Sequence, residues 1–320
     1  MSRFVVEEAV RTKIYPKIGI FSPSGGGKTY TALRLATGMV EEYKNMGLKK
    51  TEIWLANNEG SRGKYYANEF KYKIIELEPP HEPEMYYDLI DFAENSETCG
   101  VLIIDSLSKE WAGEGGCLDI ANSMGGTFQN AWKKVTPRHR RLMDKLVDSH
   151  LTIIATMRGE DQYTMETDQD GKNRIVKLGV GARTGKDFEY EFTITFSLDQ
   201  KTNSAENFKD NTHLFENRAL GKLTEQDGIN IIKWANSSDV EPVKRELKPK
   251  EPIAEDRVAN GIKAIKKLVG KLESEGVDKK VISDTIKQHH VNNNYNSITD
   301  IEVATSVYKA LEKISKEDDR

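Results

Sequence analysis

The stretch Phe21-Ser-Pro-Ser-Gly-Gly-Gly-Lys-Thr29 decides the fold. It follows a short apolar run, residues 17–21, and precedes a run from Tyr30 to Asn45 whose apolar residues recur at helical spacing. A strand, a glycine-rich loop ending in Lys-Thr and a helix, in that order, form the context in which a P-loop binds phosphate. A glycine-rich turn with a surface lysine is the alternative, and the correct flanking elements disfavour it.

The chemistry of this loop predicts ATP and Mg²⁺ as cofactors. Its glycines allow consecutive backbone N–H groups to surround a phosphate, and the helix N-terminus adds partial positive charge. Lys28 is expected to reach the β- and γ-phosphates, and the Thr29 hydroxyl to bind Mg²⁺. Ser22 stands where the motif usually has its first glycine, a position that needs a compact residue. The expected nucleotide-binding residues are Ser24, Gly25, Gly26, Gly27, Lys28, Thr29 and Tyr30.

Composition bounds the class of protein. The chain has 320 residues, 37% hydrophobic and 31% charged, which is typical of a globular protein with one large and one small domain. No apolar run approaches the roughly 20 residues of a membrane span, and charges occupy the N-terminus where a signal peptide has its apolar core. We therefore expect no membrane association and a cytoplasmic location. The two cysteines, Cys99 and Cys117, are expected to be reduced thiols, and neither has metal-ligand spacing.

The order of predicted elements indicates an α/β fold with a mostly parallel sheet. Strands are expected at residues 17–21, 51–56, 73–77, 100–106, 151–156 and 189–198, helices at 30–45, 84–95 and 137–148, a glycine-rich loop at 112–127, and a hairpin at 162–178 that turns at Asp170-Gly171. Pro137 is expected at the first position of its helix, after a Thr136 cap. Four parts are predicted: an N-terminal arm (1–16), an ATPase domain (17–235), a proline-containing linker (236–256) and a module of three helices (257–320).

Three further side chains suit phosphoanhydride chemistry. Asp105 ends an apolar strand, where P-loop enzymes keep the acid that holds Mg²⁺, and a strand-end acid capping a turn is the alternative. Glu59 follows the neighbouring strand and could orient water, although its position fits an ordinary loop acid equally well. Arg158 follows the 151–156 strand and could contact the γ-phosphate or form a strand-end salt bridge. The predicted catalytic residues are thus Glu59, Lys28 and Arg158, and the metal ligands are Thr29 and Asp105.

Four segments in this order resemble RecA-like ATPases: Ser22–Thr29, Ala56–Glu59, Leu102–Leu107 and Ile154–Arg158. The resemblance is closest to the small phage-encoded RecA-like ATPases associated with single-strand annealing and recombination, and it covers about residues 16–200. It implies a RecA-like P-loop NTPase core, binding of ATP, Mg²⁺ and single-stranded DNA (ssDNA), homo-oligomers, and a location in the host cell cytoplasm if the protein is phage-encoded. It also implies that Glu59 activates water. Met157 stands where such proteins often have a polar sensor, so either Arg158 carries that role or the sensor is missing.

A net charge of −4 means that any nucleic-acid site is a local patch or is completed by several subunits. Candidates are the loop 113–126, the basic residues Arg138, Arg140 and Arg141, and Lys263 and Lys267 on a helix face opposite an apolar stripe. Arg183 and Lys186, in a second glycine-rich loop, could complete the ATP site of a neighbouring subunit. A solvated surface is the alternative for each of these groups.

The sequence favours an ATP-dependent ssDNA-binding protein of recombination or annealing, with DNA-stimulated ATPase activity and an ssDNA-binding protein as a further partner. Two other functions stay open. One is a replication accessory that uses ATP as an assembly switch. The other is a small-molecule phosphotransferase, although such kinases usually carry an arginine-rich lid that this chain does not show.

Overall fold

The computed structural model describes the chain except for residues 1–5, 7, 125–126, 168–172, 186–187, 217–220, 239, 243–253, 275, 291–293 and 318–320. The chain divides into two compact units, Met1–Arg245 and Glu246–Arg320, and each is described by itself. Among the described residues, no helix is both long and apolar enough to cross a membrane.

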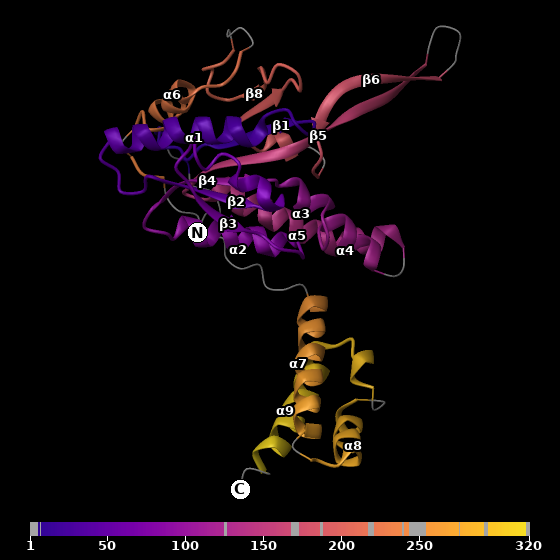
Figure 1. Cartoon of the computed structure of the whole chain (residues 1–320). Coiled ribbons are helices and arrows are strands. Elements are labelled where there is room, and N and C mark those ends of the chain that lie inside the picture. The colour runs from indigo at the N-terminus through magenta and orange to yellow at the C-terminus, as the bar shows by residue number, and fades with distance from the viewer. Residues whose placement is uncertain are drawn as a thin grey trace. The chain divides into compact units, whose positions relative to one another are not determined.

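The first unit is built on one mixed sheet (Figure 1). Its strands lie in the order β3 (Lys73–Glu76), β2 (Glu52–Asn57), β4 (Cys99–Asp105), β5 (Thr152–Thr167), β1 (Lys17–Ser22), β7 (Ile194–Leu198) and β8 (Ala205–Asp210), with β6 (Asn173–Ala182) paired to β5. The pairs from β3 to β7 are parallel, and only β6 and β8 run antiparallel to their neighbours. The predicted α/β fold with a mostly parallel sheet is confirmed.

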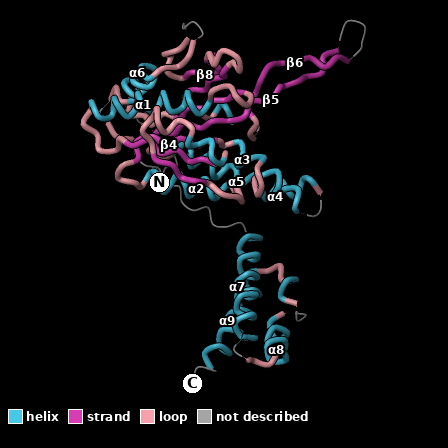
Figure 2. Tube along the Cα trace, viewed as in Figure 1, coloured by secondary structure: helices cyan, strands magenta, loops and turns pink. Residues whose placement is uncertain are grey.

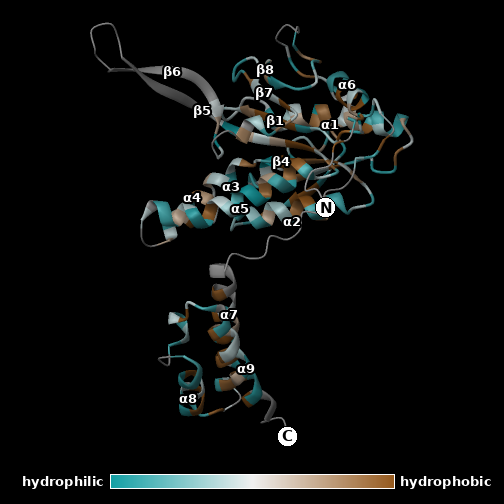
Figure 3. Ribbon diagram, turned by 180° about the vertical axis from the view of Figure 1, so that it is seen from behind, coloured by the Kyte–Doolittle hydropathy of each residue, from teal (hydrophilic) through white to brown (hydrophobic). Residues whose placement is uncertain are grey.

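Helices cover both faces of this sheet. α1 (Lys28–Asn45) and α6 (Glu225–Ala235) pack on one face, and α2 (Pro83–Glu94) and α5 (Phe128–Asp148) pack on the other (Figure 1). β4 shows why the strand needs a continuous apolar run: Val101 and Ile103 join the α1 side of the core, while Leu102 and Ile104 join the α2 side. Figure 3 shows the resulting apolar residues on α1 and on central strands such as β4.

Two predicted boundaries in the middle of the chain are wrong. α5 begins at Phe128, so Pro137 lies inside the helix rather than at its start. The apolar stripe already begins before the proline, with Ala131 and Val135 buried against Cys117 and Ala121, and this packing outweighs the one backbone hydrogen bond that proline cannot make. The same packing explains why the predicted loop 112–127 contains a helix, α4 (Cys117–Ser123), whose Cys117 and Ala121 bury against α5. The short helix α3 (Ser108–Ala112) precedes it.

β5 is much longer than the predicted strand at 151–156. It runs for 16 residues, first through the core beside β1 and then out of the sheet as one arm of the β5–β6 hairpin, which projects from the body of this unit (Figure 2). The hairpin itself was predicted, and its turn at Asp170-Gly171 lies outside the described residues. The strand predicted at 189–198 begins only at Ile194, because a 3₁₀ turn, η2 (Phe188–Tyr190), precedes it.

The described part of the N-terminal arm packs on the end of α6 and on the segment that follows it. The Lys13 N–H donates to the Val240 carbonyl (2.7 Å), and the Arg11 guanidinium donates to the Trp234 carbonyl (2.9 Å). The start of the predicted linker therefore contacts the first unit, whereas most of its remainder, residues 243–253, lies outside the described residues.

The second unit consists of α7 (Ala254–Ser274), α8 (Lys279–His289) and α9 (Ile301–Glu317). Its own core contains Ile265, Leu272, Ile286, Val307 and Leu311, all 3% exposed or less. The apolar stripes seen in the sequence meet one another here.

Lys17 is a buried lysine at the start of β1. It is 3% exposed, and its ammonium donates to the carbonyls of Tyr15 (2.7 Å), Ser149 (2.9 Å) and Leu151 (2.9 Å), which ties β1 to the segment before β5. Burial lowers the pKa of Lys17 from 10.5 to about 7, and nearby Glu94 and Asp148 oppose this shift.

We expect Lys17 to make folding stability depend on alkaline pH. Between pH 7 and 10.5 the unfolded chain keeps the lysine proton and the folded chain releases it, so this group makes stability rise with pH through that window. Chemical denaturation across this range should show a smaller rise for Lys17→Met than for wild type. Lys73→Met, at an exposed lysine that bridges Glu52, is the control and should keep the wild-type slope. Identical slopes for all three proteins would contradict the assignment.

Candidate functional site

The loop between β1 and α1 has the geometry expected of a phosphate cradle. Gly25 and Gly27 have φ values of 84° and 78°, which side-chain-bearing residues rarely adopt. Gly27 is the N-terminal cap of α1, and no described side chain caps that helix. The first N–H groups of an 18-residue helix and its positive dipole end therefore face this loop.

Ser22, the departure from the usual motif, is accommodated by Gly26. The Ser22 side chain is fully buried, and its hydroxyl donates to the Pro23 carbonyl (3.1 Å). A Cβ atom on Gly26 would lie only 1.6 Å from the Ser22 Oγ. The Ser22 hydroxymethyl group thus occupies the space that a side chain at position 26 would need.

Lys28 extends back along the loop. Its ammonium donates to the carbonyls of Ser22 (2.9 Å) and Pro23 (3.1 Å), and burial lowers its pKa. Tyr30, the last of the predicted nucleotide-binding residues, is 36% exposed and lies edge-on to Tyr66 and Phe70, with ring centroids 5.3 and 5.1 Å away.

Asp105 is the centre of the polar network. Thr29 donates its hydroxyl to the Asp105 Oδ2 (2.6 Å), and Thr156 donates to Oδ1 (2.5 Å). The carboxylate is 4% exposed, and burial raises its pKa while both threonine hydrogen bonds oppose the shift. One carboxylate therefore joins the P-loop helix, β4 and β5.

Glu59 and Arg158 form an ion pair beside this network. Arg158 Nη2 lies 3.1 Å from Glu59 Oε1, and Arg62 lies 3.6 Å from the other oxygen. The Glu59 side chain is only 19% exposed, and its charge contributes to the raised pKa of Asp105. Strand pairing brings Glu59 and Arg158 to the same edge of the sheet. Arg158 lies opposite Ser22 on β1, and Asn57, two residues before Glu59, lies opposite Asp105 on β4.

Further contacts hold the chain that leaves β4. Asn58 donates to the Ser106 carbonyl (2.8 Å) and accepts from the Ser106 N–H (3.0 Å). The Ser106 hydroxyl is buried and has no partner among the described residues. Ser108, at the start of α3, accepts from the Arg158 N–H (2.9 Å), and Lys109 donates to the Asn58 carbonyl.

These residues fit a magnesium–nucleotide complex. Unpaired helix N–H groups and the Lys28 ammonium suit phosphate oxygens, and the hydroxyl of Thr29 with the carboxylate of Asp105 suits a hard divalent cation. Burial disfavours the charged forms of both Lys28 and Asp105, and their mutual attraction offsets this only in part, so a polyphosphate and its cation would add favourable charge pairing to each group.

A family model described as AAA domain matches residues 14–230, more than half of the chain. The chain belongs to this family of P-loop ATPases. The AAA domain supports ATP binding and hydrolysis, and its nucleotide usually binds with Mg²⁺. A comparison with curated proteins finds no match.

Within the described part of the chain, the predicted arginines of α5 make no contact with this network. Arg138 forms a paired contact with Glu84 (2.8 and 2.6 Å), and Arg141 lies over the Tyr87 ring at 4.6 Å. Arg140 is exposed. Arg183 pairs with Glu160 (2.9 Å), and Lys186 lies outside the described residues.

Sequence reasoning missed several residues that support the site. Thr156 and Asn58 organise Asp105 and Ser106, and the turn between β7 and β8 places Gln200 on the Ser24 carbonyl (2.8 Å) and Asn203 next to Gly27. A polar threonine at the end of an otherwise apolar strand was the available signal for Thr156. No sequence pattern indicated the contacts of the β7–β8 turn.

The close approach of Ser22 and Gly26 gives a double-mutant prediction. Gly26→Ala should lower thermal stability and nucleotide affinity, because the new methyl group overlaps the Ser22 Oγ. Ser22→Gly in the same chain should restore both, because it removes the overlapping atoms. Differential scanning calorimetry and equilibrium binding of a fluorescent ATP analogue measure the two effects. Failure of Ser22→Gly to rescue Gly26→Ala would refute the packing explanation.

Proposed function

We propose that this chain is an ATPase that binds ssDNA in its ATP-bound state and acts in DNA recombination or annealing. The observation that carries the proposal is the course of β5. This strand bears Arg158, paired with Glu59 at the nucleotide site, and continues without a break into the projecting β5–β6 hairpin. Arg158, at the nucleotide site, therefore lies on the same strand as the projecting hairpin, so that a shift of Arg158 can be transmitted to the hairpin.

Within the proposal, this chain's own side chains have distinct roles in hydrolysis. The P-loop N–H groups and Lys28 hold the phosphates, and Thr29 with Asp105 holds the divalent cation, which supplies charge stabilisation when bound. Glu59 orients the attacking water and accepts its proton, and Arg158 positions Glu59 and contacts the γ-phosphate. The 3.1 Å pair between Arg158 and Glu59 supports this division of roles.

Two described surfaces offer positive charge for DNA. On α5, Arg138 is occupied by Glu84, so Arg140 is the more available of the predicted cations, and it lines a cavity with Trp132 and His139. In the second unit, Lys263 and Lys267 are exposed on the face of α7 opposite Ile265, and neither forms an ion pair with a described residue. We propose both surfaces as contacts for phosphates.

A homo-oligomer belongs to the same proposal. Arg183 follows directly after β6, its N–H donates to the Arg158 carbonyl (2.7 Å), and its side chain is 46% exposed. A residue so close to the nucleotide site, with its charge at the surface, suits a role in completing the site of a neighbouring subunit. We propose the same role for Lys186.

Turnover measurements test the catalytic assignment. Lys28→Ala should abolish hydrolysis and strongly weaken nucleotide binding. Glu59→Gln should retain binding but slow turnover by about 10²-fold or more, because a positioned base is lost. Glu69→Gln, at an exposed acid of the same segment, is the control and should turn over ATP normally. Unchanged turnover in Glu59→Gln would place the base elsewhere.

The same assay with and without ssDNA separates the functions. Stimulation by ssDNA supports the proposal, ATP-dependent assembly without stimulation indicates an assembly switch, and transfer of phosphate to a small acceptor indicates a kinase. Either ATP-dependent assembly or phosphate transfer to a small acceptor, if found without ssDNA binding, would refute the proposed role.

Salt dependence tests the α7 surface. The double variant Lys263→Gln/Lys267→Gln should weaken ssDNA binding and flatten the slope of log K against log salt concentration by roughly 0.7 for each lost phosphate contact. Lys287→Gln, whose lysine already pairs with Asp284 at 3.7 Å, is the matched control. An unchanged slope in the double variant would remove α7 from the DNA site.

A further inference from the structure

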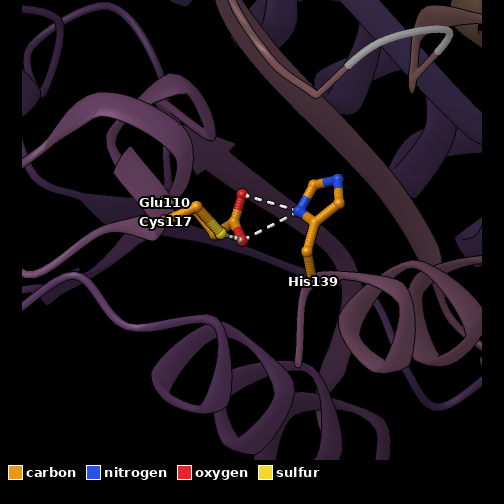
Figure 4. Close-up of side chains that lie close together, drawn as sticks. All are labelled: Glu110, Cys117 and His139. Carbon is orange, nitrogen blue, oxygen red and sulfur yellow. Dashed lines mark hydrogen bonds and ion pairs between the residues drawn. The ribbon is translucent and has the colours of Figure 1, made fainter. Parts of the chain in front are cut away.

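Three side chains with metal-ligating atoms meet outside the nucleotide site: Glu110 of α3, Cys117 of α4 and His139 of α5 (Figure 4). Their ligating atoms all lie within 4.8 Å of one another. The Cys117 Sγ is 3.0 Å from Glu110 Oε1, and the His139 Nδ1 is 2.9 and 3.1 Å from the two carboxylate oxygens. Figure 4 shows the thiol and the imidazole directed at the carboxylate from different parts of the chain.

The chain is shaped to bring these groups together. Between Glu110 and Cys117 the backbone turns sharply, and Gly115 has a φ of 72°. A Cβ atom on Gly116 would lie 2.6 Å from the carbonyl oxygens of Lys109 and Glu110, so only glycine allows α4 to approach the end of α3 this closely. The His139 ring is packed between Trp111 and Phe188, at centroid distances of 5.3 and 6.0 Å, which holds its Nδ1 toward the cluster.

Among the described residues, no lysine or arginine forms an ion pair with the Glu110 carboxylate. Glu110 is 2% exposed, and its carboxylate contacts the Cys117 thiol and the His139 imidazole. A buried carboxylate is costly unless it is paired or binds a metal. A zinc ion bound by one carboxylate, one thiolate and one neutral imidazole would have no net charge, because its two positive charges equal the two negative charges of its ligands.

One member of the cluster, His139, also borders a cavity. His139, with Trp111 and Trp132, lines a cavity of about 670 Å³ next to α5. Three protein ligands with a fourth position open to water are a common zinc arrangement, and mixed sulfur, nitrogen and oxygen ligands suit zinc better than Mg²⁺ or Ca²⁺.

We propose that Glu110, Cys117 and His139 bind one Zn²⁺ ion, with water from the adjacent cavity as the fourth ligand. The Sγ–H bond of Cys117 breaks as the sulfur–zinc bond forms, and the proton passes to solvent. The ion joins α3, α4 and α5, and so braces the segment between the nucleotide site and the exposed part of α5. The inference does not rest on the proposed DNA function.

Cobalt substitution tests the site in the full-length protein without nucleotide. After chelation and dialysis, titration with Co²⁺ should produce near-ultraviolet absorption from a thiolate–cobalt bond, saturating at one ion per chain. Zn²⁺ should displace the cobalt and abolish the signal. Cobalt at Thr29 and Asp105 cannot produce this absorption because neither residue contains sulfur, so the readout does not depend on the ATPase assignment.

Variants identify the ligands. Cys117→Ser should lose the absorption, whereas Cys99→Ser, at the other buried cysteine, should keep it. His139→Ala should weaken Co²⁺ binding by more than the 10- to 100-fold that is typical for loss of a partner outside the ligand sphere. Circular dichroism checks that each variant is folded. Absence of the absorption in folded wild-type protein, or its persistence in Cys117→Ser, would overturn the proposal.

Discussion

The buried carboxylate of Asp105 is the constraint on which the rest of the first unit depends. It is nearly inaccessible to water, and its two oxygens accept from Thr29 at the start of α1 and from Thr156 in β5. Burial disfavours its charge, and the two hydroxyl donors offset that cost in part. Loss of either donor would leave a buried oxygen without its partner, so the P-loop helix, β4 and β5 have to keep one relative position.

β5 transmits this constraint beyond the core. Within the sheet it lies between β4 and β1, and it contributes Thr156 to Asp105 and Arg158 to Glu59. Beyond Arg158 the same strand pairs with β6 in the hairpin. A strand that is hydrogen-bonded on both sides in the core is a rigid base for such an extension. The β5–β6 hairpin is therefore positioned by the part of β5 that contacts the P-loop strand, although the hairpin is far from the P-loop in sequence.

Local patterns in the sequence were sufficient for the central strands and for the residues at their carboxyl ends. Continuous apolar runs located β1, β2, β4 and the first part of β5, and parallel pairing then brings Lys28, Asp105, Glu59 and Arg158 to one edge. What failed depended on tertiary packing. The helix through Pro137 forms because Ala131 and Val135 bury against α4, and α4 forms in a stretch whose glycines suggested a loop. Likewise, no sequence pattern indicated that Cys117 lies beside Glu110 and His139, because the three residues come from separate helices.

The short helix α3 connects the two polar centres of this unit. At its start, Ser108 accepts from the backbone of Arg158 and Lys109 donates to the Asn58 carbonyl, so this end is held by the nucleotide site. Glu110 follows immediately and lies in the cluster with Cys117 and His139. A five-residue helix has too few internal hydrogen bonds to hold its own position. Its geometry must therefore come from these contacts at both ends, and the bracing of Glu110 by α4 and α5 bears directly on the residues that surround Arg158 and Asn58.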